Sequence, residues 1–411
     1  MTKNYIKFYP VDNGDSSMIT LAGGMIILVD CNIRQASIGS TDPAVFDVRK
    51  DILQSIKRRN GIPYTDVFIL THGDCDHCRG FKENFYQGNP DNYSAEDKKA
   101  DKIVIDEMWF SPMIAEKHTN DDEDAYQQEA ERRLALHMKG GAEKDSPGNR
   151  IKIVGYDGNK NYSALNHLRA TPGTVVNTFN NVKLDTFSVF IHAPFKEHLT
   201  SAEKDKNSTS IVFQARFKNK PTDSDFSGLA MFGGDSDHYS WGIILEKTKR
   251  YKNDVKEKAL DWDLFLAPHH CSWSFFNDTP QSENDEPKET SLEVLDYRRS
   301  NAKVIASSKE IVNDDDNPPH YEAKIEYVSK VGGSNFLSTA TEPSKKKPLP
   351  IIFEIAEEGV KRVDSGAKAE DLRKVAEGIK FGAIGTSTAG KLTTMAENVV
   401  KHQPHRFYGE K

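Results

Sequence analysis

The sequence predicts an α/β protein, and three observations lead to that prediction. Apolar runs of strand length recur along the chain, for example at residues 25–29 and 67–70. Residues 42–60 carry apolar side chains at helical spacing, and residues 121–138 begin with acidic side chains and end before two glycines, a helix stop signal. Several apolar runs end in residues that can bind metals. We therefore expect functional residues at the ends of strands.

The expected strands follow in chain order, beginning with a three-stranded meander that closes on Asp30. Residues 111–170 are predicted to form a helical insertion over the site. Residues 356–411 contain amphipathic helical stretches at 371–379 and 392–400. The complete set of predicted strands comprises residues 5–10, 17–21, 25–30, 67–70, 103–110, 182–191, 211–213, 229–232, 262–267, 302–308 and 350–355.

Length and composition restrict the class of protein. The 411 residues are 37% hydrophobic and 28% charged, which allows one large domain with insertions or two smaller ones. The chain has only four cysteines, no signal-peptide segment at its start and no run of eighteen apolar residues, so we expect a cytoplasmic protein outside the membrane. A net charge of −7 argues against non-specific coating of nucleic acid but permits a nucleic-acid substrate.

The densest group of metal-capable side chains lies in residues 71–80, directly after the apolar run Val67–Leu70. A strand end followed by a tight turn can direct four such side chains into one small volume. Imidazole nitrogen and carboxylate oxygen together suit borderline or hard divalent ions such as Zn²⁺ or Mn²⁺. The segment therefore predicts a metal site, whose first candidate ligands are His72, Asp74, Asp76 and His77.

This segment reads His-x-Asp-x-Asp-His, which resembles the second motif of the metallo-β-lactamase superfamily, where the pattern is more often His-x-His-x-Asp-His. Asp74 in place of the second His, with Thr71 before the motif, resembles the hydrolase domain of the ComEC-type competence proteins and their free-standing relatives. The likeness covers residues 4–355. It implies a four-layer αββα sandwich for residues 1–355, followed by a C-terminal helical extension at 356–411.

The resemblance implies roles for residues outside this loop. Asp30 would orient the metal loop by hydrogen bonds, and Asn207 and Ser210 would border the active site. Gly233-Gly234-Asp235 matches the fourth motif, so Asp235 would bridge two metals. His192 is placed like the ligand of the third motif, although His198 is a nearby rival.

Pro268-His269-His270-Cys271-Ser272 resembles the His-His-Gly-Ser of the ComEC-type domains, with Cys271 in the glycine position. Two adjacent histidines cannot easily share one metal, so His269 and His270 are predicted catalytic residues together with Asp76. Such an imidazole can hold a phosphate oxygen or protonate a leaving group. Three aromatic residues that follow could offer a stacking surface for a base or could be ordinary core residues, namely Trp273, Phe275 and Phe276.

His320 follows the last core strand, where the superfamily has its fifth motif, and is the candidate that closes the second metal site. His269 is the competing assignment. In this interpretation two divalent ions, Zn²⁺ or Mn²⁺, lie roughly 3.5–4 Å apart and hold a bridging hydroxide. The predicted metal ligands are His72, Asp74, Asp76, His77, His192, Asp235 and His320.

The function expected from this likeness is that of a metal-dependent phosphodiesterase, and specifically a nuclease that degrades foreign or damaged nucleic acid, for instance in phage defence. One alternative is a hydrolase of a small phosphodiester, cyclic nucleotide, thioester or lactam. Another is a non-catalytic partner-binding protein with a relic site. A third assigns Cys75, Cys78 and Cys271 to a structural zinc or redox cluster, although no second CxxC completes four ligands.

The C-terminal segment contains one misleading motif. Residues 385–392 almost form a phosphate-binding P-loop, but Leu392 stands where Ser or Thr is required. Too few residues follow for a nucleotide-binding sheet, so we reject this motif. Residues 356–411 are instead expected to dock on the domain, to bind a protein partner or to mediate homo-oligomer formation.

Overall fold

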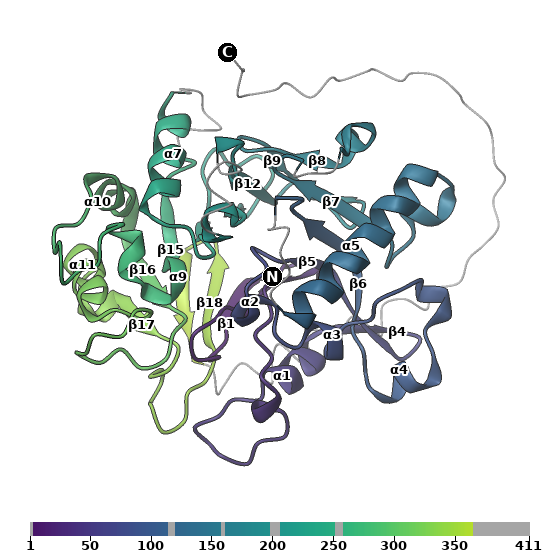
Figure 1. Ribbon diagram of the computed structural model, residues 1–411, viewed down its shortest axis with the longest axis horizontal. Helices are drawn as coiled ribbons and strands as arrows, with labels where there is room; N and C mark the ends of the chain where they lie inside the picture. Colours follow the sequence, from purple (N-terminus) through teal and green to yellow (C-terminus); the bar gives the residue numbers. More distant parts are fainter. Residues whose placement is uncertain (1–2, 114–119, 158–160, 198–205, 251–257, 365–411) are drawn as a thin grey trace.

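The computed structural model describes residues 3–113, 120–157, 161–197, 206–250 and 258–364. Two mixed β-sheets form the centre of the molecule, with helices on their outer sides (Figure 1). The protein is thus of the predicted α/β class. His198, the P-loop-like motif and the helical stretches at 371–379 and 392–400 lie outside the described residues.

The first sheet has ten strands and carries most of the N-terminal half of the chain. Its central strands β3, β5, β6, β7 and β8 run parallel, whereas the remaining pairs are antiparallel. Strand β4 pairs only with β5. In spatial order the others are β19 (Gly359–Val363), β18 (Ile351–Ala356), β1 (Asn4–Phe8), β2 (Ser17–Thr20), β3 (Ile26–Val29), β5 (Ile62–Ile69), β6 (Val104–Phe110), β7 (Arg150–Val154) and β8 (Arg169–Ala170), with β4 at Lys57–Arg59.

The second sheet has seven strands. Strands β14 to β17 run parallel, and β9, β12, β13 and β14 pair antiparallel. A separate hairpin joins β10 (Thr178–Phe179) to β11 (Val182–Lys183). The spatial order is β17 (Phe336–Ser338), β16 (Arg298–Ala306), β15 (Trp262–Leu266), β14 (Gly228–Phe232), β13 (Val212–Phe217), β12 (Phe187–Ala193) and β9 (Val175–Val176).

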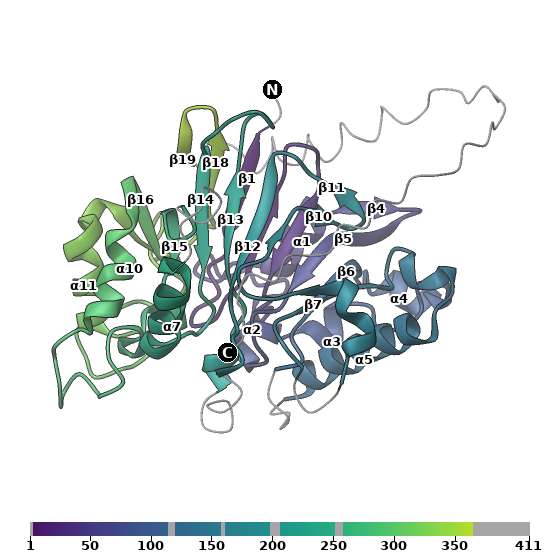
Figure 2. The same ribbon diagram turned by 90° about the horizontal axis from the view of Figure 1, so that it is seen from above.

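Three apolar cores hold these elements together. One core contains inward residues of both sheets, such as Ile69 and Phe232, so the sheets pack on each other. A second lies between the first sheet and helices including α5, and a third lies between the second sheet and α7, α10 and α11. Figure 2 shows these helices on opposite sides of the sheets. The α-helices are α1 (Val48–Ser55), α2 (Cys75–Cys78), α3 (Phe81–Asn84), α4 (Ala95–Lys99), α5 (Asp121–Lys139), α7 (His238–Lys249), α9 (Pro268–Cys271), α10 (Glu289–Asp296) and α11 (Tyr321–Val331).

The long helix predicted at 121–138 is confirmed as α5. The Asn120 side chain accepts a hydrogen bond from the backbone N–H of Glu123, and Gly140 ends the helix at φ +80°. Residues 111–170 also supply β7 and β8, which extend the first sheet. The short 3₁₀ segments of the structure are Gln35–Ser37, Pro90–Asn92, Ala142–Asp145, Ser163–Leu168, Lys206–Thr209, Trp273–Phe275 and Gly333–Asn335.

The helix predicted over residues 42–60 is shorter than expected. Helix α1 ends at Ser55, and residues 57–59 form strand β4. Asn60 and Gly61 both have positive φ, +53° and +84°, as a two-residue hairpin turn of the Asn-Gly type requires. The turn therefore converts the end of the apparent helix into a β-hairpin. Residues 359–363 form strand β19, although they fall within the segment 356–411 that is predicted to be a helical extension.

Candidate metal centre

The metal loop extends from the carboxyl end of β5. Asp30 follows the neighbouring parallel strand β3, so both segments leave the first sheet at the same edge. The backbone N–H of Asp30 donates to the carbonyl of Ile69, and the N–H of Thr71 donates to Oδ1 of Asp30 at 2.7 Å. The loop then turns into the single helical turn α2, which carries Asp76 and His77.

The second sheet contributes its own strand ends to the same region. Asp235 follows β14, and His269 and His270 follow the parallel neighbour β15. Gly234 adopts φ +52°, and a Cβ there would lie 3.0 Å from the Cβ of Ser210, so glycine permits this close approach. His269, His270 and Cys271 all adopt positive φ, which is costly for residues other than glycine and turns the two imidazoles away from the strand.

The two carboxylate oxygens of Asp235 face different histidines. Oδ2 lies 3.4 Å from Nε2 of His72 and 3.7 Å from Nε2 of His269. Oδ1 lies 3.0 Å from Nε2 of His77 and 3.5 Å from Nε2 of His270. One carboxylate therefore lies between two imidazole pairs, and each pair combines one residue from each sheet.

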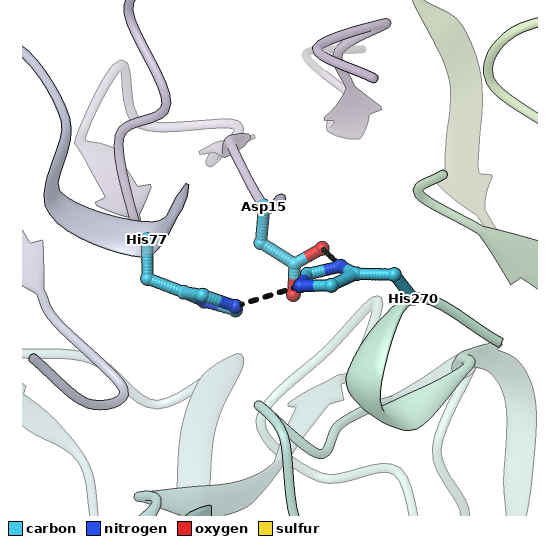
Figure 3. Close-up of side chains that lie close together, drawn as sticks. All are labelled: Asp15, His77 and His270. Atoms are coloured by element: carbon cyan, nitrogen blue, oxygen red, sulfur yellow. Dashed lines mark hydrogen bonds and ion pairs between the residues drawn. The ribbon is translucent and has the colours of Figure 1, made fainter. Parts of the chain in front are cut away.

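Asp15 and Asp76 approach the second of these pairs. Nε2 of His270 lies 3.1 Å from Nε2 of His77 and 3.3 Å from Oδ2 of Asp76. Asp15 also faces the His270 ring, with Oδ1 3.7 Å from Nδ1 (Figure 3). Gly14 makes this packing possible, because a Cβ at that position would lie only 2.4 Å from the carbonyl oxygen of Asp76.

Hydrogen bonds around Asp30 set the orientation of two imidazoles. Nδ1 of His77 lies 2.9 Å from Oδ2 of Asp30 and donates its proton there. The Thr71 hydroxyl also donates a hydrogen bond to Oδ2 at 2.8 Å. The hydroxyl oxygen of Thr71 can therefore accept a hydrogen bond from Nδ1–H of His72 at 3.2 Å. Both rings consequently turn Nε2 toward Asp235, where the nitrogen can hold either a proton or a cation. The expected orienting role of Asp30 fits this geometry.

The pKa shifts reflect the concentration of charge. Burial favours the neutral form of His77, but Asp235 and Asp30 outweigh it and raise the pKa of His77 well above its usual value. Burial likewise opposes charge on His270, yet Asp235, Asp15 and Asp76 raise the pKa of His270 to about 10. Asp235 is fully buried, and its histidine neighbours nevertheless lower the pKa of Asp235 well below the usual range. The cluster is thus a strongly anionic pocket that attracts protons or cations.

Three buried atoms of the cluster lack a hydrogen-bond partner within the described chain: Nε2 of His72, Oδ1 of Asp235 and Oδ1 of Asp15. Such groups are costly unless something satisfies them. Two overlapping sets have ligand atoms within 4.8 Å of one another, namely Asp15, His77 and His270, and His72, His77 and Asp235. Nitrogen and oxygen donors in this arrangement fit one or two divalent ions.

Other predicted ligands differ in their placement. Asp74 is at the rim, with Oδ2 3.8 Å from Nε2 of His72. His192 is not brought to the cluster: its Nε2 lies 2.8 Å from the carbonyl oxygen of Ala259, and burial lowers its pKa to about 3. His320 is also elsewhere: it directly precedes α11, and its ring centroid lies 5.8 Å from that of Trp273. Of the two histidines, His270 is the one that lies beside His77 and Asp235.

The sequence analysis missed Asp15 as a candidate ligand. The signal was present in Asn13-Gly14-Asp15-Ser16, which combines a glycine turn with an acid directly after the first predicted strand. Ser210 does border the centre, since its Oγ accepts a hydrogen bond from the backbone N–H of Asp235 at 3.3 Å.

Of the two alternatives for the aromatic residues after the His-His pair, the structure supports ordinary core residues. Trp273, Phe275 and Phe276 have at most 2% of their surface exposed and belong to the third apolar core. The cysteines form no metal set among the described residues: Cys78 and Cys271 are buried, and Cys75 is exposed. Burial raises the pKa of the Cys78 thiol well above its usual value, which disfavours the thiolate that metals bind.

Comparison with models of known protein families finds no match, and comparison with curated protein sequences finds none either. In the described residues, no helix combines the length and apolar character needed to cross a membrane.

Proposed function

We propose that the protein is a metal-dependent hydrolase that uses two divalent ions to cleave phosphodiester bonds, most plausibly in nucleic acid, and that its sheets and helices form a metallo-β-lactamase-type αββα sandwich. The observation that carries this proposal is the position of Asp235. Each of its oxygens faces a separate imidazole pair, as a carboxylate that bridges two cations requires. An imidazole nitrogen has one lone pair and can bind one ion. Two pairs of imidazoles on opposite oxygens of Asp235 therefore fit two ions better than one.

The residues divide naturally between the two ions. The first would be held by His72, His269 and Oδ2 of Asp235, with Asp74 at the rim. The second would be held by His77, His270 and Oδ1 of Asp235, with Asp76 and Asp15 as further oxygen donors. Paired divalent ions supply Lewis acidity, a water ionised at neutral pH and stabilisation of the leaving oxygen.

The chain itself supplies orientation and access. Asp30 and Thr71 hold the rings of His77 and His72 so that each Nε2 is available to a cation. The side chains of Asp76 and Asp74 are about one-third exposed, at 30% and 31%, so the substrate would approach from their side. His269 is also partly exposed, and Oγ of Ser274 lies 3.0 Å from its Nδ1, which fixes the ring.

A phosphodiester is the substrate class best matched to this donor set. It carries a negative charge that two cations neutralise, and it needs stabilisation of both the attacking and the leaving oxygen. Degradation of foreign or damaged nucleic acid, as in phage defence, is a role that fits such an enzyme. Hydrolysis of a small phosphodiester, cyclic nucleotide, thioester or lactam is the alternative on the same scaffold.

The test combines metal analysis with cleavage. Purified protein is assayed by mass spectrometry for bound metals and then incubated with single- and double-stranded DNA and RNA in added Mn²⁺ or Zn²⁺. We expect about two ions per chain and divalent-dependent cleavage that is lost in Asp76→Ala/His77→Ala. Cleavage retained in that double variant would refute the proposal, and turnover of a small substrate alone would favour the alternative.

A further inference from the structure

Two arginines are brought together beside the candidate metal centre. Residues 31–34 lie alongside residues 77–79, because the N–H of Cys31 donates to the carbonyl of His77 at 2.8 Å and the N–H of Ile33 donates to the carbonyl of Arg79 at 2.9 Å. Arg34 follows this pairing directly. The guanidinium groups of Arg34 and Arg79 therefore lie close enough to interact, and burial together with the positive charge of Arg79 lowers the pKa of Arg34.

The two guanidinium groups differ in their partners. Arg34 forms an ion pair with Asp12, whose side chain is largely exposed. Arg79 is only partly exposed, yet its guanidinium forms no hydrogen bond or ion pair with the part of the chain that the structure describes. Two adjacent like charges are unfavourable unless an anion lies between them. Asp12 thus neutralises the charge of Arg34, and the positive charge of Arg79 remains without an acid partner among the described residues.

The pair lies within one helical turn of the proposed reaction centre. Arg79 is the residue at which α2 ends, three positions after Asp76, and its N–H donates to the carbonyl of Cys75. Asp76 in turn has its Oδ2 3.3 Å from Nε2 of His270. Asp122 is the other nearby acid, and its carboxylate accepts hydrogen bonds from the backbone N–H groups of Gly80 and Lys82.

We propose that Arg79, supported by Arg34, binds a backbone phosphate of the substrate next to the phosphate that is cleaved. This inference depends on the proposed function for the identity of the substrate. Guanidinium groups bind phosphate oxygens through paired N–H donors, so two adjacent arginines suit a phosphate better than an uncharged group. A subsite one turn from Asp76 selects a chain with at least two phosphates, which favours an oligonucleotide over a small cyclic diester.

The test measures binding separately from cleavage. The probe is a fluorescein-labelled single-stranded phosphorothioate oligonucleotide, which keeps the backbone charge and resists hydrolysis, and binding to metal-loaded protein is followed by fluorescence anisotropy at several salt concentrations. Arg79→Gln is expected to weaken binding about tenfold or more. Loss of one phosphate contact also reduces the slope of log K against log salt by about 0.7. Arg79→Lys keeps the charge and should preserve that slope while losing the paired donors.

Two controls make the result specific. Lys82→Gln removes a nearby positive charge that is 52% exposed and paired with Asp121, and it should leave affinity and slope unchanged. Arg34→Gln in an Asp12→Asn background should weaken binding without leaving an unpaired acid. Metal content and the melting temperature are measured for every variant, so that a folding defect is recognised.

The outcomes for the subsite and for the proposed function are distinct. If Arg79→Gln binds the probe as wild type does, or if it changes no more than Lys82→Gln, the subsite is refuted whether or not the enzyme cleaves nucleic acid. If wild-type protein binds the probe through Arg79 but cleaves no nucleic acid with either metal, the proposed function fails and the phosphate subsite remains. Failure of wild-type protein to bind the probe would also overturn the subsite.

Discussion

Nδ1 of His77 lies 2.9 Å from Oδ2 of Asp30, and this contact determines how His77 can act. One ring proton is held on the Asp30 side, so Nε2, 3.0 Å from Oδ1 of Asp235, is the nitrogen that carries the second proton in the metal-free protein and that a cation would bind in its place. Asp30 follows β3 and His77 lies in α2, yet both are fully buried at the same sheet edge. Pairs of this kind prepare a metal ligand before the metal arrives.

The first prediction concerns this contact. Asp30→Asn replaces an acceptor oxygen by a donor and removes the charge that fixes the His77 ring, so metal affinity should fall about 10- to 100-fold. Competition with a chromophoric chelator measures the change. Asp106→Asn is the matched control, because Asp106 is equally buried but is paired with Arg59. An equal loss of affinity in both variants would show that Asp30 has only a general structural role.

The second prediction separates His270 from His320. His270→Gln should lose one of the two ions and reduce cleavage at least 100-fold, because Nε2 of His270 lies within the cluster. His320→Gln should retain metal content and most activity, since its ring packs against Trp273. Metal content by mass spectrometry and initial cleavage rates are the measurements. Loss of an ion in His320→Gln would instead support the ligand set predicted from the sequence.

The third prediction tests whether Asp235 bridges the two ions. Asp235→Asn removes the charge that faces both imidazole pairs, so binding of both ions should weaken together and activity should disappear. Asp237→Asn is the control, because Asp237 caps α7 through the N–H of Ser240 and asparagine caps a helix about equally well. A protein that retains one tightly bound ion in Asp235→Asn would contradict the bridging role.

The fourth prediction concerns pH. Asp235, Asp15 and Asp76 raise the pKa of His270 to about 10 despite burial, whereas an unfolded histidine titrates near about 6.5. Protonated His270 therefore stabilises the metal-free protein below pH about 6.5, and this contribution declines as the pH rises toward 10. Thermal melts in the presence of a chelator should show this decline.

The same melts on His270→Gln provide the comparison for the pH prediction. The variant should lose part of the decline between pH about 6.5 and 10, because it lacks the raised pKa of His270. Its remaining slope would come from His77, whose pKa is also raised. Identical pH profiles for the variant and the wild type would contradict the assignment.

The fifth prediction excludes the cysteines from the centre. Burial raises the pKa of the Cys78 thiol, and the described residues place no cysteine sulfur in a metal set. Cys75→Ser/Cys78→Ala should therefore retain metal content, whereas Asp76→Ala should lose it. A thiol-reactive dye measures the cysteines independently. Loss of zinc from the cysteine variant with retention in Asp76→Ala would favour a cysteine cluster.

Local features of this protein could be predicted from the amino-acid sequence. Apolar runs predicted most of the strands, acid and glycine signals predicted helix α5, and the spacing of His72, Asp76 and His77 predicted a metal-capable loop. These features depend on neighbouring residues, so they can be recognised from periodicity and spacing. Gly233-Gly234 before Asp235 was likewise a local signal, and the structure requires glycine at Gly234.

Only the tertiary structure decided which distant residues meet. His192, His270 and His320 all follow or end apolar strands, and that position alone does not show which of them reach the centre. The positive φ angles of His269 and His270 turn the two imidazoles to opposite oxygens of Asp235, whereas His192 faces the carbonyl of Ala259. Side-chain direction at a strand end is determined by backbone strain and by packing between sheets, and both depend on contacts that are remote in sequence.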